Sequence, residues 1–175
     1  MGMYGEYLRV TPDELARSIA DPVWGRQLAD SVIEAEFVEE PAEPRNYGTD
    51  KSWHGLQYLL QRAGFPLDIV TGEQSFVEKL ENWDELEGSE VDWGAGPPGY
   101  LTPEQVKLAA ELLARTPFEK LIEGVEPAEL IREHIYPQVW DRPGQLEQLG
   151  HHYDYLPAYF AAAARAGDAV ICWIA

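Results

Sequence analysis

The stretch DKSWH, residues 50–54, places an acid, a base, a hydroxyl, an indole and an imidazole side by side. If the stretch is helical, Asp50 and His54 lie one turn apart, and a carboxylate at that spacing can orient an imidazole that acts as a general base. The same spacing also fits a capping carboxylate and a histidine at the boundary between core and solvent. We favour the structural interpretation and keep His54 and Asp50 as the candidates for catalysis.

The residues after Asp50 predict a helix. Trp53, Leu56 and Leu60 follow at i+3, i+6 and i+10, which places the indole on the buried stripe and Asp50 at the N-cap. The helix is expected to run to about residue 63, where Gly64 ends it. His54 is then rotated by about 100° from the indole, to the edge of the buried face.

Aromatic residues elsewhere add to the candidate binding surface. We expect a cleft near Trp53, Tyr100 and Trp140, with His54 and Tyr58 among the residues that could contact a partner.

Three other motifs do not support a site. GAGPPG, residues 94–99, matches a phosphate-binding pattern, but its two prolines lack the backbone N–H groups that a phosphate needs. His151 and His152 point about 100° apart on a helix and no third ligand accompanies them, so they are interpreted as exposed histidines rather than a metal site. Cys172 lies in an apolar strand and is interpreted as a buried, inert thiol. The sequence therefore predicts no metal and no cofactor.

The net charge is strongly negative. The 175 residues contain 31 acids and 13 Lys or Arg, a formal charge of −18, and residues 73–92 alone hold eight acids and one lysine. Such a surface repels nucleic acids and anionic membranes. It favours either general solubility or a surface complementary to a basic protein partner.

The elements predicted at the two ends suggest one α+β domain spanning residues 1–175. Residues 3–10 and 169–175 are predicted strands of one small sheet, the latter central because both of its faces are apolar. Residues 146–166 predict a long helix that Pro157 kinks or divides near residues 150–153. Several helices are expected to pack over the sheet.

Three Thr-Pro pairs predict helix starts with threonine at the N-cap, at Thr11, Thr102 and Thr116. Two acidic stretches, residues 34–50 and 82–99, are predicted loops. Trp83 and Trp93 lie in the second of them, and their rings are expected to be buried.

Several of these segments together resemble the YfbM-like family of small bacterial proteins, a domain of unknown function. The resemblance rests on MGMYGEYLRVTPDEL at the start, DKSWHGLQYLL, GPPGYLTPEQV, IYP at residues 135–137 and AYFAAAARAGDAVICWIA at the end. It implies a single α+β domain in the bacterial cytoplasm and brings no known activity with it.

Two functional hypotheses remain. The first is a non-enzymatic cytoplasmic binding or regulatory module, a monomer or weak homodimer, whose acidic surface engages a partner. The second is a hydrolase or transferase that uses His54 as the base and Asp50 as its orienter. The first is preferred because the sequence identifies no nucleophile, no set of metal ligands and no cofactor-binding motif.

The sequence also predicts where the protein is located. The N-terminus has no basic and apolar segments typical of a signal peptide, and the longest apolar runs have seven residues, which predicts a cytoplasmic protein.

Overall fold

A five-stranded antiparallel sheet forms the centre of the computed structural model, which describes residues 2–79 and 93–175. The strand order within the described residues is β2-β1-β5-β4-β3. The strands are β1 (Gly5–Val10), β2 (Asn46–Asp50), β3 (Gln74–Ser75), β4 (Gly99–Leu101) and β5 (Ala169–Ile174).

The two terminal strands lie next to each other, as the sequence predicts. β1 pairs with β5 from Gly5↔Ile174 to Val10↔Ala169. Tyr4 and Ala175 extend the pair through two reciprocal backbone hydrogen bonds. β5 has a neighbour on both sides, and every one of its residues is buried. The predicted central position is thus confirmed, and burial raises the pKa of the Cys172 thiol well above its ordinary value.

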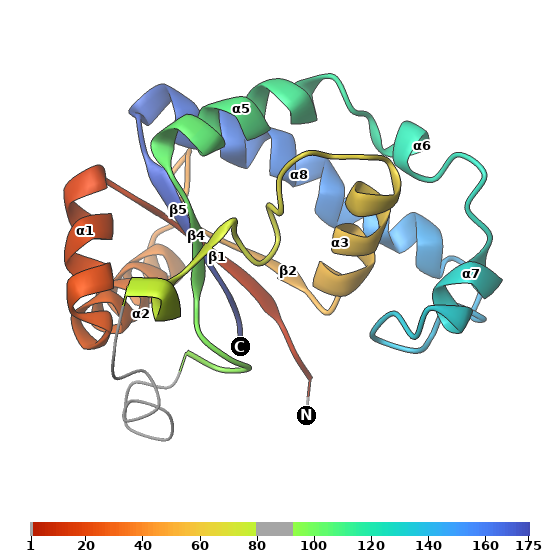
Figure 1. Ribbon diagram of the computed structural model, residues 1–175, viewed down its shortest axis with the longest axis horizontal. Helices are drawn as coiled ribbons and strands as arrows, with labels where there is room; N and C mark the ends of the chain where they lie inside the picture. Colours follow the sequence, from red (N-terminus) through yellow and green to blue (C-terminus); the bar gives the residue numbers. More distant parts are fainter. Residues whose placement is uncertain (1, 80–92) are drawn as a thin grey trace.

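Helices cover both faces of the sheet, as Figure 1 shows. On one face lie α1 (Pro12–Ala20) and α2 (Pro22–Val38), and on the other lie α3 (Trp53–Arg62), α5 (Pro103–Ala114) and α8 (Gln145–Ala166). The shorter α6 (Phe118–Leu121) and α7 (Pro127–Arg132) extend this second layer, and η1 (Phe76–Lys79) follows β3. The fold is α+β, as predicted.

Side chains of β5 alternate between two hydrophobic clusters, one on each face. Ile171 and Trp173 pack with α1 and α2, whereas Val170 and Cys172 pack with the larger cluster under α3, α5 and α8. This alternation is the period of two that a strand buried on both faces requires.

Two of the three predicted threonine caps are present. Thr11 with Glu14, and Thr102 with Gln105, form complete capping boxes with proline in the first turn. The prediction for Thr116 is wrong, because its hydroxyl donates to the Leu112 carbonyl at the end of α5. Pro117 instead precedes α6 without any side-chain cap.

α8 runs unbroken past Pro157, so the predicted division of this helix is wrong. Proline removes the single N–H that would reach the Tyr153 carbonyl. Tyr153 and Phe160, one turn before and after it, are both buried and hold the two halves against the same core. Gly167 ends the helix in a left-handed conformation, as predicted.

The predicted loop over residues 34–50 is also wrong at both ends, because α2 continues to Val38 and β2 begins at Asn46. The Glu36 carboxylate on α2 accepts the backbone N–H groups of Arg45 and Asn46, where the edge strand β2 begins. Glu36 thereby fixes the start of a strand that the sequence pattern alone does not reveal. In the second predicted loop Trp93 is buried as expected, and Trp83 lies outside the described residues.

Candidate functional site

The DKSWH stretch crosses from a strand to a helix. β2 stays paired with β1 as far as Gly5↔Asp50, so Asp50 belongs to the strand, and the N-cap of α3 is Ser52. The prediction of Asp50 as N-cap is therefore wrong. Asp50 has φ = 51°, the left-handed conformation that aspartate tolerates better than most residues. The predicted end of the helix is confirmed, with Gly64 just beyond it.

Trp53 is half-buried rather than fully buried. Its ring packs against the edge of the larger cluster, and its Nε1 donates to the Met3 carbonyl at 3.2 Å. The buried stripe of α3 consists instead of Gly55, Leu56, Leu59 and Leu60. The helix starts two residues later than predicted, and its first residue lies at the margin of the core.

His54 is held by a backbone amide and not by Asp50. Its Nδ1 accepts the Tyr136 N–H at 2.9 Å, and its ring stacks on Trp53 with the centroids 4.9 Å apart. Burial lowers the pKa of His54, so the neutral form dominates near pH 7. Because Nδ1 is already an acceptor, the geometry contradicts a general base oriented by Asp50.

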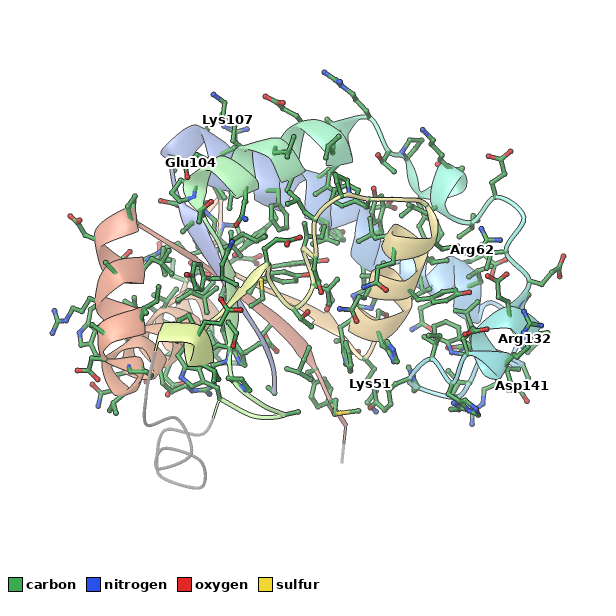
Figure 2. All side chains as sticks on the ribbon, in the orientation of Figure 1. Lys51, Arg62, Glu104, Lys107, Arg132 and Asp141 are labelled. Carbon is green, nitrogen blue, oxygen red and sulfur yellow. The ribbon has the colours of Figure 1, made fainter. Side chains whose placement is uncertain are left out.

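The remaining predicted binding residues do not share a cleft. Tyr58 donates to the Glu129 carboxylate on α7. Arg62, which Figure 2 labels on α3, contacts the same carboxylate. Tyr100 is buried on the opposite face of the sheet, in the cluster that faces α1 and α2. Trp140 is buried under α3 and α8, where its Nε1 donates to the Ile135 carbonyl at 2.8 Å. The single aromatic cleft is therefore a wrong prediction.

A cavity of about 240 Å³ lies between the end of β2, the loop before α8 and the first half of α8. We call it the β2–α8 cavity. Its polar lining consists of Asp50, Lys51, Ser52, Gln145, Gln148 and His152. Its apolar wall consists of Pro137, Val139, Trp140 and Leu149. Figure 2 shows Lys51 at the base of α3, on the side of the molecule that also carries the loop with Asp141. Of the predicted site residues, Asp50 and Trp140 line this cavity.

His152 is the titratable ring of the cavity. Burial lowers its pKa, with a smaller opposing effect from the Asp50 carboxylate, which raises it. The interpretation of both α8 histidines as exposed holds for His151 and is wrong for His152, which is half-buried. The spacing of Gln145, Gln148 and His152 at i, i+3 and i+7 is the sequence signal that could have placed them on one face.

A second hollow, a groove of about 640 Å³, lies between residues 40–44 and the second half of α8. We call it the loop–α8 groove. α8 contributes Tyr155, Ala158, Tyr159, Ala161, Ala162 and Arg165, and the opposite wall consists of Glu40, Ala42, Glu43, Pro44 and Tyr47. The ring of Tyr155 is 67% exposed at its rim. Sequence reasoning did not predict this groove.

Two hydrogen bonds tie this groove to the rest of the molecule. Tyr159 donates to the Arg45 carbonyl at 2.8 Å, and Tyr47 donates to the His152 carbonyl at 2.6 Å. The second bond lies between the groove and the β2–α8 cavity. β2 and α8 therefore form both hollows along one shared seam.

No helix in the described part of the chain combines the length and apolar character needed to cross a membrane. Among residues 2–79 and 93–175, no group of three or more His, Cys, Asp or Glu side chains is placed to hold a metal ion. The described residues thus offer two concave surfaces lined by polar and apolar groups.

An α+β domain with an antiparallel sheet, terminal strands side by side and helices on both faces defines the class of this protein. The chain belongs to the family described as a domain of unknown function (DUF1877), whose model matches residues 1–173. The predicted resemblance is thereby confirmed.

A solved structure supports the same fold. The protein of unknown function YfbM from Escherichia coli matches with a TM-score of 0.59 and 18% sequence identity, over 98% of this chain and 99% of that one. At this identity the match shows the fold alone. No curated protein matches this chain.

Proposed function

We propose that this protein is a non-enzymatic binding module, and that the loop–α8 groove receives a basic segment of a partner protein. The observation that carries this proposal is an apolar groove with acidic rims. The apolar surface of the groove accepts apolar side chains of the partner. The acidic residues around the groove favour lysine or arginine next to those side chains in the partner's sequence.

Two exposed apolar residues at the end of α2 precede the groove in the chain. Phe37 and Val38, which are 91% and 81% exposed, precede the loop that forms one wall of the groove. Across the groove stands the exposed ring of Tyr155. Exposed apolar residues beside a concave surface are typical of protein-binding sites.

The charge around the groove is negative. Residues 34–45 contain five glutamates and one arginine. That arginine, Arg45, is paired with Glu14, and Arg165 in the groove is paired with Glu43. Glu40 is exposed on the rim, in no ion pair with any described residue. On the α8 side the Asp154 carboxylate raises the pKa of Tyr47 in the groove, after the larger effect of burial. A partner with lysine or arginine beside its apolar anchors is therefore complementary.

The test uses short synthetic peptides in matched sets, with the same leucine and phenylalanine anchors and with flanking lysine and arginine, glutamate or serine. Fluorescence anisotropy measures their affinity for the full chain at low and high salt. We expect micromolar binding of the basic peptides only, weakened by salt.

Charge-matched variants separate the groove from the net charge. Glu40→Lys should abolish binding, whereas Glu119→Lys on α6, at the far end of the molecule from the end of α8 in Figure 1, should leave most of it. Equal losses in both variants would overturn the proposal, because net charge alone would then explain binding. A concentration-dependent dimer that Tyr155→Ala abolishes would also overturn it, since a second copy would then fill the groove.

A further inference from the structure

The β2–α8 cavity has a lining that the proposed function does not use. Its volume of about 240 Å³ exceeds the roughly 150 Å³ of a cavity that holds benzene, so it has room for a ligand on the order of ten non-hydrogen atoms. Three separate parts of the chain supply its walls: the end of β2, the loop before α8 and α8 itself. We propose that this cavity is a binding site for a free α-amino acid with a small or medium-sized apolar side chain.

The first argument is the pair of opposite charges at the cavity. Asp50 and Lys51 both line it, and neither forms an ion pair with any of the described residues, including the other. The Lys51 ammonium lies 5.8 Å from the centroid of the Tyr4 ring, a weak contact that leaves its hydrogen-bond donors available. A zwitterion satisfies both charges at once: its ammonium group binds Asp50 and its carboxylate binds Lys51.

The second argument is the start of two helices beside the cavity. Ser52, the N-cap of α3, makes no side-chain capping bond, so its hydroxyl is available to a ligand. α8 begins at Gln145 after Gly144, which has no side chain to cap it. Both helix starts add positive potential near Lys51, which favours the carboxylate of the ligand.

The third argument concerns the remaining groups. Gln148 and His152 add neutral hydrogen-bonding groups from one face of α8. Trp140 from the loop before α8 and Leu149 from α8 itself add apolar surface that suits an aliphatic side chain. Two charged ends and one apolar side are the chemistry of an amino acid such as leucine.

The experiment compares leucine with two analogues that each lack one charge: leucinamide, without the carboxylate, and 4-methylpentanoate, without the ammonium group. Isothermal titration calorimetry and thermal melts are run on the full chain, with ligand at millimolar concentration. We expect leucine to bind and to raise the melting temperature, and each analogue to bind about tenfold more weakly or less.

Two cavity variants and two controls localise the binding. Asp50→Asn keeps a residue that tolerates the left-handed backbone, and Lys51→Met removes the ammonium group but keeps an unbranched side chain of similar length. Each variant should weaken leucine binding by about tenfold or more. Asp141→Asn and Lys107→Met change charges outside the cavity, at positions that Figure 2 labels, and should leave binding unchanged.

Three results would overturn the proposal. They are no binding of any of the standard amino acids at millimolar concentration, equal binding of leucine and 4-methylpentanoate, or binding that survives Asp50→Asn. Glu40→Lys and Tyr155→Ala in the loop–α8 groove should not affect leucine, which keeps this test independent of the proposed partner site.

Discussion

The two halves of α8 border two different hollows. The first half presents amide and imidazole groups to the β2–α8 cavity, and the second half presents alanine and tyrosine to the loop–α8 groove. Both halves bury the same side of the helix in one cluster. The comparison teaches that one amphipathic helix can fill a single core and still give each of its two ends a hollow with a different lining.

The two hollows also differ in the exposure of one aromatic residue at each of them. Trp140 in the cavity wall is 4% exposed, whereas Tyr155 at the groove is 67% exposed. The wall of the cavity therefore contains a buried aromatic ring, and the rim of the groove carries an exposed one. Each prediction below breaks or sharpens this contrast.

The largest expected effect comes from the cavity wall. Trp140→Ala removes a buried ring and the hydrogen bond to Ile135, and should lower the free energy of unfolding by about 3–5 kcal/mol. Tyr155→Ala, the matched change at the groove, should stay within about 0.5 kcal/mol of the wild type. Denaturant titration measures both. Equal losses would show that the groove is part of the core.

A pH-dependent effect is expected at Glu6, which lies opposite Gly48 of β2 and, unlike the residues of the two hollows, has Arg26 of α2 as a charged neighbour. Burial raises the pKa of Glu6 to about 7, with Arg26 lowering it and Asp50 raising it. The folded protein thus binds this proton more tightly than the unfolded chain, so stability is lost as the pH rises through about 7.

Glu6→Gln removes that loss. Relative to the wild type, the variant should gain about 2 kcal/mol between about pH 5 and pH 8, a value reduced for the solvent that still reaches the carboxylate. Denaturant titrations at both pH values give the difference. A constant difference would show that the carboxylate titrates normally.

The bond between the two hollows should have a smaller effect. Tyr47→Phe removes the hydroxyl that donates to the His152 carbonyl, and should cost about 1 kcal/mol. Tyr155→Phe removes an exposed hydroxyl on the same seam and serves as the control, with almost no expected change. If the two variants melt alike, this hydrogen bond does not stabilise the seam.

The smallest effect is a pKa change that identifies the partner of Asp50. Asp50→Asn removes the charge that raises the pKa of His152, so this pKa should fall further below its ordinary value. The pKa of His54, which burial alone lowers, should not change. NMR titration of the two imidazoles measures both. If Asp50→Asn changed the pKa of His54 and left that of His152 unchanged, Asp50 would instead be paired with His54, as the i, i+4 spacing in the sequence suggests.

Local patterns predicted much of the fold. The terminal strands, the Thr11 and Thr102 caps and the Gly167 stop all follow from the chemistry of a few neighbouring residues. The edge strand β2 was missed because its start depends on a carboxylate of α2, nine and ten residues earlier in the chain.

The hollows could not be predicted in the same way. Asp50 and His152 come from distant parts of the chain, and only the packing of β2 beside α8 brings them to one cavity. The i, i+4 spacing pointed to His54 because sequence separation was the only available measure of proximity. Tyr100 was grouped with Trp53 and Trp140 in one cleft because the position of β4 in the sheet depends on its pairing with β5, which the local residues do not reveal.

The carboxylate of Glu36 has one more consequence, for how this protein behaves at high concentration. An edge strand with open N–H groups is a template on which another chain can add a strand and start an aggregate. Glu36 occupies the N–H groups at the start of β2 and places a negative charge there. An approaching strand meets no free donor at that end and is repelled if it is acidic, as every copy of this chain is. Edge-to-edge polymerisation of the sheet is thereby disfavoured.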